Sequence, residues 1–310
     1  MVYFVAEMSA NHNGSLETAL EICKAAKESG ADAVKLQTYT PSGMSMDKEL
    51  YNLYTHAYTR QKWHKEIFDY CKEIGITCFS TPFEKKDVDL LEGLGCPIYK
   101  VASFEIVDIP LIQYIAKTGK PIILSTGMAT TMEIEDAMRA GNCNVTLLKC
   151  TSAYPARPED ANLLTIPDMI RRYHLPVGIS DHTIGIGVPV AAVTLGATVV
   201  EKHFTIEKKG IDSEFSLLPD EFALMVQECK RVENAPGNVQ YGATSNEWTK
   251  YRRSLWVVKD IEKGLRFRDE HIRSLRPNMG ISPKYLSAII GKKAKKHLKK
   301  GDPLKWDCIT

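Results

Sequence analysis

The sequence has 310 residues and a mass of 34.7 kDa, of which 44% of residues are hydrophobic and 25% charged. These values are typical of a globular protein and exclude disordered, collagen-like and fibrous chains. No apolar run reaches the roughly 18 residues that a membrane span needs, and residues 1–7 lack the basic start of a secretory signal. We therefore expect a cytoplasmic protein with one large domain and one small one.

The charge is distributed unevenly. The net charge is +2, but residues 252–310 carry 16 Lys and Arg against 6 Asp and Glu, a net charge of +10. Residues 1–251 carry 24 basic and 32 acidic residues, a net charge of −8. This asymmetry indicates a charged binding partner and says little about the fold.

Eight cysteines are scattered along the chain without a C-x-x-C pair, at positions 23, 71, 78, 96, 143, 150, 229 and 308. This spacing argues against a disulfide framework and against a thiolate metal cluster. Most of them are expected to be small buried side chains.

Short β-branched runs alternate with helical patterns from the start of the chain. Strands are predicted at 3–7, 32–37, 76–80, 97–101, 121–125, 145–149, 176–180 and 197–203. Helices are predicted at 15–29, 60–74, 84–94, 108–118, 130–139, 162–173, 186–195 and 219–234. Eight such units predict an α/β fold, a (β/α)8 TIM barrel. An open doubly wound sheet is the alternative, but no G-x-G-x-x-G motif follows the first strand.

The end of the chain follows a different pattern. The predicted barrel covers residues 1–235, and the Pro-, Gly- and polar-rich stretch 236–252 is interpreted as a linker. Residues 253–310 contain short strands and turns and are close to the lower size limit for an independent core.

Two histidines stand at the ends of the last two predicted barrel strands. His182 shares a strand face with Ser180, and His203 shares one with Glu201. Because side chains at the carboxyl ends of barrel strands line the mouth, both imidazoles are predicted to converge there. Two imidazoles near a carboxylate suit Mn²⁺, Zn²⁺ or a similar divalent ion.

Lysines also end predicted barrel strands, which is unusual for buried positions. Lys35 shares a face with Gln37 on the second strand, and Lys100 ends the fourth. They indicate an anionic ligand such as a phosphate or carboxylate, the alternative being that they extend to the solvent at the rim. Hydroxyl groups are predicted around the same mouth: Ser80, Thr81, Ser103, Ser125, Thr126, Thr151, Ser152 and Ser180.

Glu7, at the end of the first strand, is the inward carboxylate of the predicted mouth. It either transfers a proton or forms an ion pair with Lys35 or Lys100. A metal, an anion clamp and a carboxylate together indicate a reaction on a phosphorylated or carboxylated metabolite with a carbonyl group to polarise.

Specific strings then add a resemblance. In chain order they are AEMSANHNG (6–14), AVKLQTY (33–39), STPF (80–83), YKVASFEI (99–106), STGM (125–128), KCTSAYP (149–155), GISDHTIG (178–185) and EKHFT (201–205). They resemble the sialic acid synthase family, enzymes that condense phosphoenolpyruvate with an amino sugar. RRSLWVVKDIEKG (252–264) and RPNMGISPKYL (276–286) are similar to the C-terminal antifreeze-like (SAF) domain of that family.

Within the family, SANHNG, CTSAYP and the segment LYNLYTHAYT that ends at residue 59 are most similar to the pseudaminic acid synthases. That resemblance implies the sugar 2,4-diacetamido-2,4,6-trideoxy-L-altrose as substrate and pseudaminic acid with phosphate as products. N-acetylneuraminate or legionaminate synthase is the alternative, and a synthase of the deoxy-heptulosonate type is a more remote one. A nucleic-acid-binding role for the lysine-rich segment 292–300 is disfavoured because aromatic residues are not interleaved with its lysines.

The resemblance also implies roles for individual residues. His182 and His203 would bind the metal, with Mn²⁺ expected and Mg²⁺ or Co²⁺ as alternatives, and Glu7 would be the acid–base carboxylate. The residues implied for phosphoenolpyruvate are Lys35, Thr81, Lys100, Ser103, Ser125, Ser152 and Ser180. Those implied for the sugar are Glu105, Tyr154, Asp212 and, from a partner subunit, Arg276. A domain-swapped homodimer is thereby implied.

Two differences from the family pattern concern Ser152 and the start of the chain. Sialic acid synthases commonly carry Asn at the position of Ser152, and a serine there is consistent with the pseudaminic acid branch. Family members usually have a short leading segment before the first strand, whereas this sequence starts directly at that strand. We expect this difference to affect stability and leave the chemistry intact.

Overall fold

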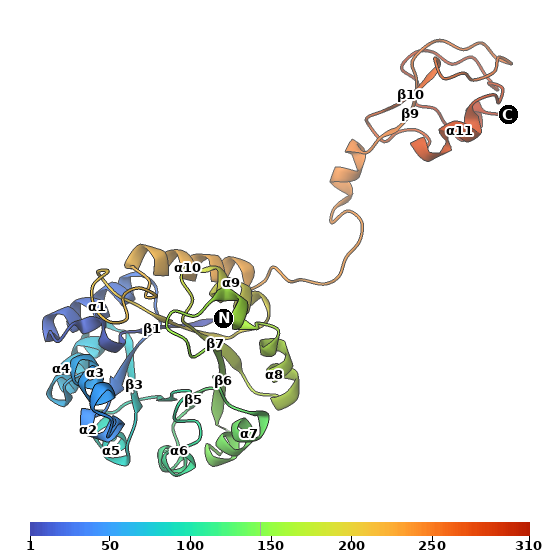
Figure 1. The fold of residues 1–310 in the computed structure, drawn as a ribbon. Coiled ribbons are helices and arrows are strands. Elements are labelled where there is room, and N and C mark those ends of the chain that lie inside the picture. Colours follow the sequence, from blue (N-terminus) through green and yellow to red (C-terminus); the bar gives the residue numbers. More distant parts are fainter. Residues whose placement is uncertain (143) are drawn as a thin grey trace. The chain divides into compact units, whose positions relative to one another are not determined.

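The computed structural model describes residues 1–142 and 144–310, except for the side chain of residue 246. The chain divides into two compact units, Met1–Gly237 and Asn238–Thr310. In the first unit, eight parallel strands form a closed barrel in which each strand pairs with the next and β8 pairs with β1 (Figure 1). This arrangement confirms the predicted TIM barrel.

Each barrel strand is followed along the chain by a helix that covers the barrel. The strands are β1 (Tyr3–Glu7), β2 (Ala33–Thr38), β3 (Thr77–Pro82), β4 (Tyr99–Val101), β5 (Ile122–Ser125), β6 (Val145–Cys150), β7 (Val177–Asp181) and β8 (Val199–His203). The covering helices are α1 (Leu16–Glu28), α4 (Gln61–Ile74), α5 (Lys85–Gly93), α6 (Ile109–Ala116), α7 (Thr131–Ala140), α8 (Thr165–Tyr173), α9 (Gly187–Thr194) and α10 (Pro219–Val232).

The hydrophobic core lies between the strands and the surrounding helices. Leu36 of β2 and Ile22 of α1 are completely buried there, as are Val200 of β8 and Phe222 of α10. The ring of Phe222 packs edge-on against Phe204, just beyond β8, with centroids 5.3 Å apart. Burial of each such side chain contributes about 1.5–3 kcal/mol to the stability of the fold. This burial holds the apolar side chains of each strand toward the helices.

The connection from β2 to α4 was not predicted to contain helices, but it holds α2 (Pro41–Met44) and α3 (Lys48–Ala57). Neither helix has a fully buried residue, although Leu50, Leu53, Tyr54 and Ala57 of α3 recur at the i, i+3, i+4, i+7 spacing of an amphipathic helix. The predicted helix 162–173 instead begins at Thr165. Before it, the short 3₁₀ helix η2 (Pro158–Ala161) ends at Asn162, whose φ of 44° interrupts the helical conformation.

The second unit has its own small core. β9 (Ser254–Val257) pairs antiparallel with β10 (Ile272–Leu275), and short helical turns surround them: η3 (Asn246–Tyr251), η4 (Pro283–Tyr285), α11 (Leu286–Ile289) and η5 (Trp306–Cys308). The buried apolar side chains of the unit include Leu255, Val257, Ile261, Phe267, Ile272, Ile289, Leu298 and Leu304. The stretch predicted as the linker 236–252 therefore contains an ordered 3₁₀ helix.

Two predictions concern the chain as a whole. In the described residues, no helix has both the length and the apolar character that crossing a membrane requires. Seven cysteines in this part of the chain are free and buried, as expected. Cys143 lies outside the described residues.

Candidate active site

Four charged side chains meet inside the barrel. The Nζ of Lys35 lies 2.8 Å from Oε2 of Glu7 and 3.5 Å from Oε2 of Glu201. The Nζ of Lys100 lies 3.7 Å from Oε1 of Glu201. All four residues are at most 4% exposed. The two ammonium groups thus occupy the barrel interior, and the alternative that they extend to solvent is wrong.

The burial of these groups changes their proton affinities. Although burial opposes it, the two carboxylates Glu201 and Glu7 raise the pKa of Lys35, so this lysine stays charged. Burial lowers the pKa of Lys100, and the opposing attraction of Glu201 is too weak to cancel this effect. Burial also raises the pKa of Glu7, which favours a carboxyl group that can hold a proton.

Hydroxyl groups accompany these charges. Lys35 donates to Oγ1 of Thr81 over 3.4 Å, and Lys100 donates to Oγ of Ser125 over 2.7 Å. Ser180 donates to Oε1 of Glu201 over 2.8 Å. The structure therefore brings together both lysines and three of the predicted hydroxyls.

Ser103 and Ser152 flank the loop that follows β5. The backbone N–H of Gly127 donates to Oγ of Ser103 over 3.1 Å. A Cβ atom at Gly127 would lie 2.4 Å from Oγ of Ser152 and 2.8 Å from Oγ of Ser103. Only glycine leaves room for both hydroxyls beside this loop.

Three of the eight predicted hydroxyls are engaged elsewhere. Ser80 faces the helical layer, where its Oγ lies 2.6 Å from Oγ1 of Thr38, itself bonded to His64 of α4. Adjacent residues of a strand alternate between faces, so Ser80 and Thr81 cannot both point inward. Thr126 and Thr151 donate to the carbonyls of Leu148 and Asp160.

The two predicted metal histidines lie side by side. The ring centroids of His182 and His203 are 5.3 Å apart, with the planes at 61°. The ring centroid of Phe215 lies 4.8 Å from that of His203 and 6.2 Å from that of His182. The ring centroid of Tyr154 lies 4.3 Å from that of His182 and 6.4 Å from that of His203. Tyr154 is 49% exposed, so one side of this aromatic group faces solvent.

The imidazole nitrogens fit a divalent ion. Nδ1 of His182 lies 3.0 Å from the carbonyl of Thr151, which favours the tautomer with a lone pair on Nε2. Nδ1 of His203 is buried without a hydrogen-bond partner. Burial and the neighbouring His182 lower the pKa of His203 well below its usual range, so the ring is neutral, as a metal ligand must be. Within residues 1–142 and 144–310, no cluster of three His, Cys, Asp or Glu side chains has metal-binding geometry.

The predicted sugar-binding residues lie in both units of the chain. Oδ2 of Asp212 lies 3.8 Å from Nδ1 of His203 and accepts a hydrogen bond from the N–H of Ala10. Oε2 of Glu105 is buried without a hydrogen-bond partner, and burial raises the pKa of Glu105 to about 7. Arg276 follows β10 in the second unit. The barrel unit contains the other three predicted sugar-binding residues, Glu105, Tyr154 and Asp212.

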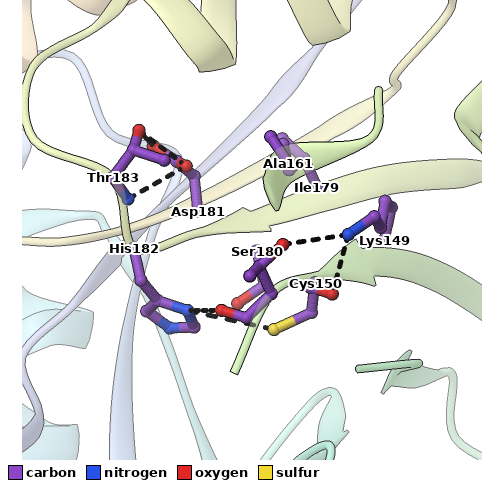
Figure 2. Close-up of a pocket in the computed structure, with 9 residues that line it drawn as sticks. Lys149, Cys150, Ala161, Ile179, Ser180, Asp181, His182 and Thr183 are labelled. Carbon is purple, nitrogen blue, oxygen red and sulfur yellow. Dashed lines mark hydrogen bonds between the residues drawn. The ribbon is translucent and has the colours of Figure 1, made fainter. Parts of the chain in front are cut away.

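Several residues of this site were not among the predicted site residues. The sequence places Glu201 and Gln37 only on the strand faces of His203 and Lys35, whereas in the structure Gln37 donates to both Glu7 and Ser9 over 3.2 Å. Strand alternation was the signal that could have included them. Figure 2 shows the sulfur of Cys150 near the His182 ring, 3.9 Å from Nδ1. No sequence pattern indicated Phe215, because it lies in an irregular loop.

The comparisons with known proteins agree with this geometry. The NeuB family profile matches residues 22–241, and the SAF domain profile matches residues 252–310. The chain belongs to the NeuB family. It is 46% identical to the pseudaminic acid synthase of Helicobacter pylori over 98% of this chain and 97% of that protein. It is 43% identical to the pseudaminic acid synthase of Campylobacter jejuni serotype O:2 over 98% of this chain and 95% of that protein.

A solved structure supports the same assignment. The N-acetylneuraminic acid synthetase of Leptospira borgpetersenii, in complex with citrate, superposes with a TM-score of 0.75 at 34% identity. The match covers 80% of this chain and 89% of that one. Membership of the family and the SAF domain were both predicted from the motifs, and both predictions are confirmed.

Proposed function

We propose that this protein is a pseudaminic acid synthase. It condenses phosphoenolpyruvate with 2,4-diacetamido-2,4,6-trideoxy-L-altrose and water to give pseudaminic acid and phosphate. The observation that carries this proposal is the 46% identity to the Helicobacter pylori enzyme over nearly the whole of both chains. The paired lysines and paired histidines at one barrel mouth supply the chemistry such a reaction needs.

The anionic substrate is bound by the two ammonium groups. Lys35 and Lys100 lie on β2 and β4, with the hydroxyls of Thr81, Ser125 and Ser180 beside them. Ser103 and Ser152 add neutral donors around Gly127. Phosphoenolpyruvate carries a phosphate and a carboxylate, and both are matched by fixed cations in a site largely closed to water.

A divalent ion, Mn²⁺ or alternatively Mg²⁺ or Co²⁺, would be held by His182 and His203. Bound there, it would supply Lewis-acid polarisation of the aldehyde oxygen of the open-chain sugar. The unpartnered Nδ1 of His203 and the 5.3 Å ring separation support this assignment.

The remaining chemistry belongs to residues of the chain. C3 of phosphoenolpyruvate attacks the aldehyde carbon, water adds at C2, and the adduct breaks its C–O bond to release phosphate. Lys35 and Lys100 stabilise the anionic groups throughout, and Glu7 accepts or returns a proton. Glu105, Tyr154 and Asp212 hold the sugar, and the partner subunit's Arg276 reaches its acyl group in a domain-swapped homodimer. The proposed location of the enzyme is the cytoplasm.

Phosphate release tests the proposal. Purified protein is incubated with phosphoenolpyruvate, Mn²⁺ and one of a panel of sugars, and the released phosphate and the nine-carbon product are measured. Turnover with the altrose derivative at a kcat/KM well above all other sugars supports the proposal. Preference for N-acetylmannosamine or for the legionaminate precursor supports the alternative synthases. Turnover only with a sugar phosphate supports the deoxy-heptulosonate type.

A further inference from the structure

Two charged residues of the motifs SDHT and EKHF have no part in the proposed reaction. Asp181 and Lys202 precede the two metal histidines, on β7 and β8. They lie opposite each other in the register of the two strands. Because strand residues alternate, both point to the outer face of the barrel. Figure 2 shows the Asp181 carboxylate and the His182 ring on opposite sides of the chain.

These side chains form a closed and fully bonded group. Nζ of Lys202 lies 2.5 Å from Oδ2 of Asp181 and also donates to the carbonyl of Thr183. The hydroxyl and the N–H of Thr183 donate to Oδ1 of Asp181 over 2.9 and 3.2 Å. Lys202, Thr183 and Asp181 are 0%, 1% and 3% exposed.

A buried ion pair of this kind is a poor source of stability, since desolvation consumes most of its attraction. Its lasting effect is geometric, because it fixes the distance between the groups it joins. Here it joins the backbone on either side of His182 to the residue before His203. The same segment is fixed again where the N–H of Ala156 donates to the carbonyl of His182 over 3.0 Å.

We propose that Asp181 and Lys202 are positioning residues that set the spacing of His182 and His203 for a divalent ion from the opposite face of the barrel. The inference rests on the proposed function, because it takes the two histidines as ligands. Substitution of partners outside the ligand shell typically costs 10–100-fold in metal affinity. The ion pair contacts neither substrate, so its effect reaches the reaction only through the histidines.

Mn²⁺ affinity in the absence of both substrates tests this inference. Free Mn²⁺ is followed by electron paramagnetic resonance during titration of the full-length protein, well below the melting temperature of each variant. The variants are Asp181→Asn, Lys202→Met and the double variant. Asp87→Asn is the matched control, because Asp87 is also a fully buried carboxylate, bonded to loop N–H groups after β3.

We expect each single variant to raise the Mn²⁺ dissociation constant about tenfold or more, while Asp87→Asn lowers the melting temperature and leaves the Mn²⁺ constant unchanged. The double variant should bind Mn²⁺ no more weakly than the worse single variant, because the pair acts as a unit. Wild-type affinity in folded Asp181→Asn overturns the inference, as do losses that add in the double variant. Should Lys202→Met fail to fold, Asp181→Asn, which keeps the shape of the side chain, decides.

Failure of the proposed metal site would look different. In that case wild-type protein would bind no Mn²⁺, or His203→Ala would bind it as tightly as wild type. Either result removes the ligand assignment and the positioning role together, whereas tight binding in wild type with unchanged binding in Asp181→Asn removes the positioning role alone.

Discussion

At the scale of single residues, His203 combines three properties that suit a metal ligand. It is 7% exposed, its pKa is lowered by burial and by His182, and its Nδ1 has no hydrogen-bond partner. His203→Ala should reduce kcat by at least about 100-fold and weaken Mn²⁺ binding, because one of the two proposed protein ligands is removed. Steady-state phosphate release and Mn²⁺ titration measure both effects. His297→Ala, at a partly exposed histidine of the second unit, is the control. Full activity of His203→Ala would refute the ligand assignment.

Glu105 gives a prediction on pH. Burial raises its pKa from 4.5 to about 7 in the folded protein. Between these values the folded state binds more protons than the unfolded chain, so the free energy of unfolding falls as pH rises and levels off above about pH 7. Glu105→Gln should remove about 2 kcal/mol of this fall, the full shift being reduced because the side chain is partly exposed.

Urea unfolding at pH 5 and pH 7.5 measures this difference. The comparison with wild type cancels the contribution of all other groups. If wild type and Glu105→Gln lose the same free energy between the two pH values, Glu105 does not titrate in this range.

At the scale of elements, the loop after β5 depends on one small residue. A Cβ at Gly127 would come within 2.4 Å of Oγ of Ser152 and 2.8 Å of Oγ of Ser103. Both contacts are with the ends of rotatable side chains, so Gly127→Ala should fold with a loss of about 1 kcal/mol, the low end of the cost of an added methyl group. The hydroxyls must turn away, which should raise the KM for phosphoenolpyruvate about tenfold.

The KM for phosphoenolpyruvate is measured for Gly127→Ala beside Gly187→Ala, where a Cβ meets no atom within 4 Å. Only the first variant should differ from wild type. A KM unchanged in Gly127→Ala would exclude Ser103 and Ser152 from the phosphoenolpyruvate site.

The element scale also shows how much the sequence determines. Every barrel strand was predicted within two residues of its observed bounds, because burial on both faces, by the helices outside and by side chains inside the barrel, imposes continuous β-branched runs. Alternation within strands was enough to place Lys35 beside Glu7 and His182 beside His203. Helix α3 was not predicted, although Asp47 caps its first turn and its apolar residues recur at helical spacing. Phe215 and the cradle around Gly127 depend on loop conformation, which no periodic pattern encodes.

At the scale of the whole molecule, the uneven charge has a measurable consequence. Residues 252–310 carry a net charge of +10 and the rest of the chain −8. We expect the basic unit to dock on the acidic barrel of a partner subunit and to attract phosphoenolpyruvate by long-range electrostatics. Raising the salt from about 20 to 300 mM should therefore weaken the proposed dimer and raise the KM for phosphoenolpyruvate about threefold or more.

Analytical ultracentrifugation and steady-state kinetics at the two salt concentrations check this expectation. The KM for the uncharged sugar, measured above the dissociation constant of the dimer, is the internal control. A dimer constant and a phosphoenolpyruvate KM that both ignore salt would contradict the docking hypothesis.

The opposed roles of neighbouring residues in β7 and β8 also limit how this enzyme can diverge. Loss or gain of a single residue early in β8 would turn Lys202 into the barrel and His203 out of it, and the same change early in β7 would exchange the faces of Ser180 and Asp181. Such insertions and deletions should be lethal to activity even where each substitution alone is tolerated. Length changes are then confined to the loops beyond the strands, and new acceptor preferences can arise there without disturbing the proposed metal and phosphate sites.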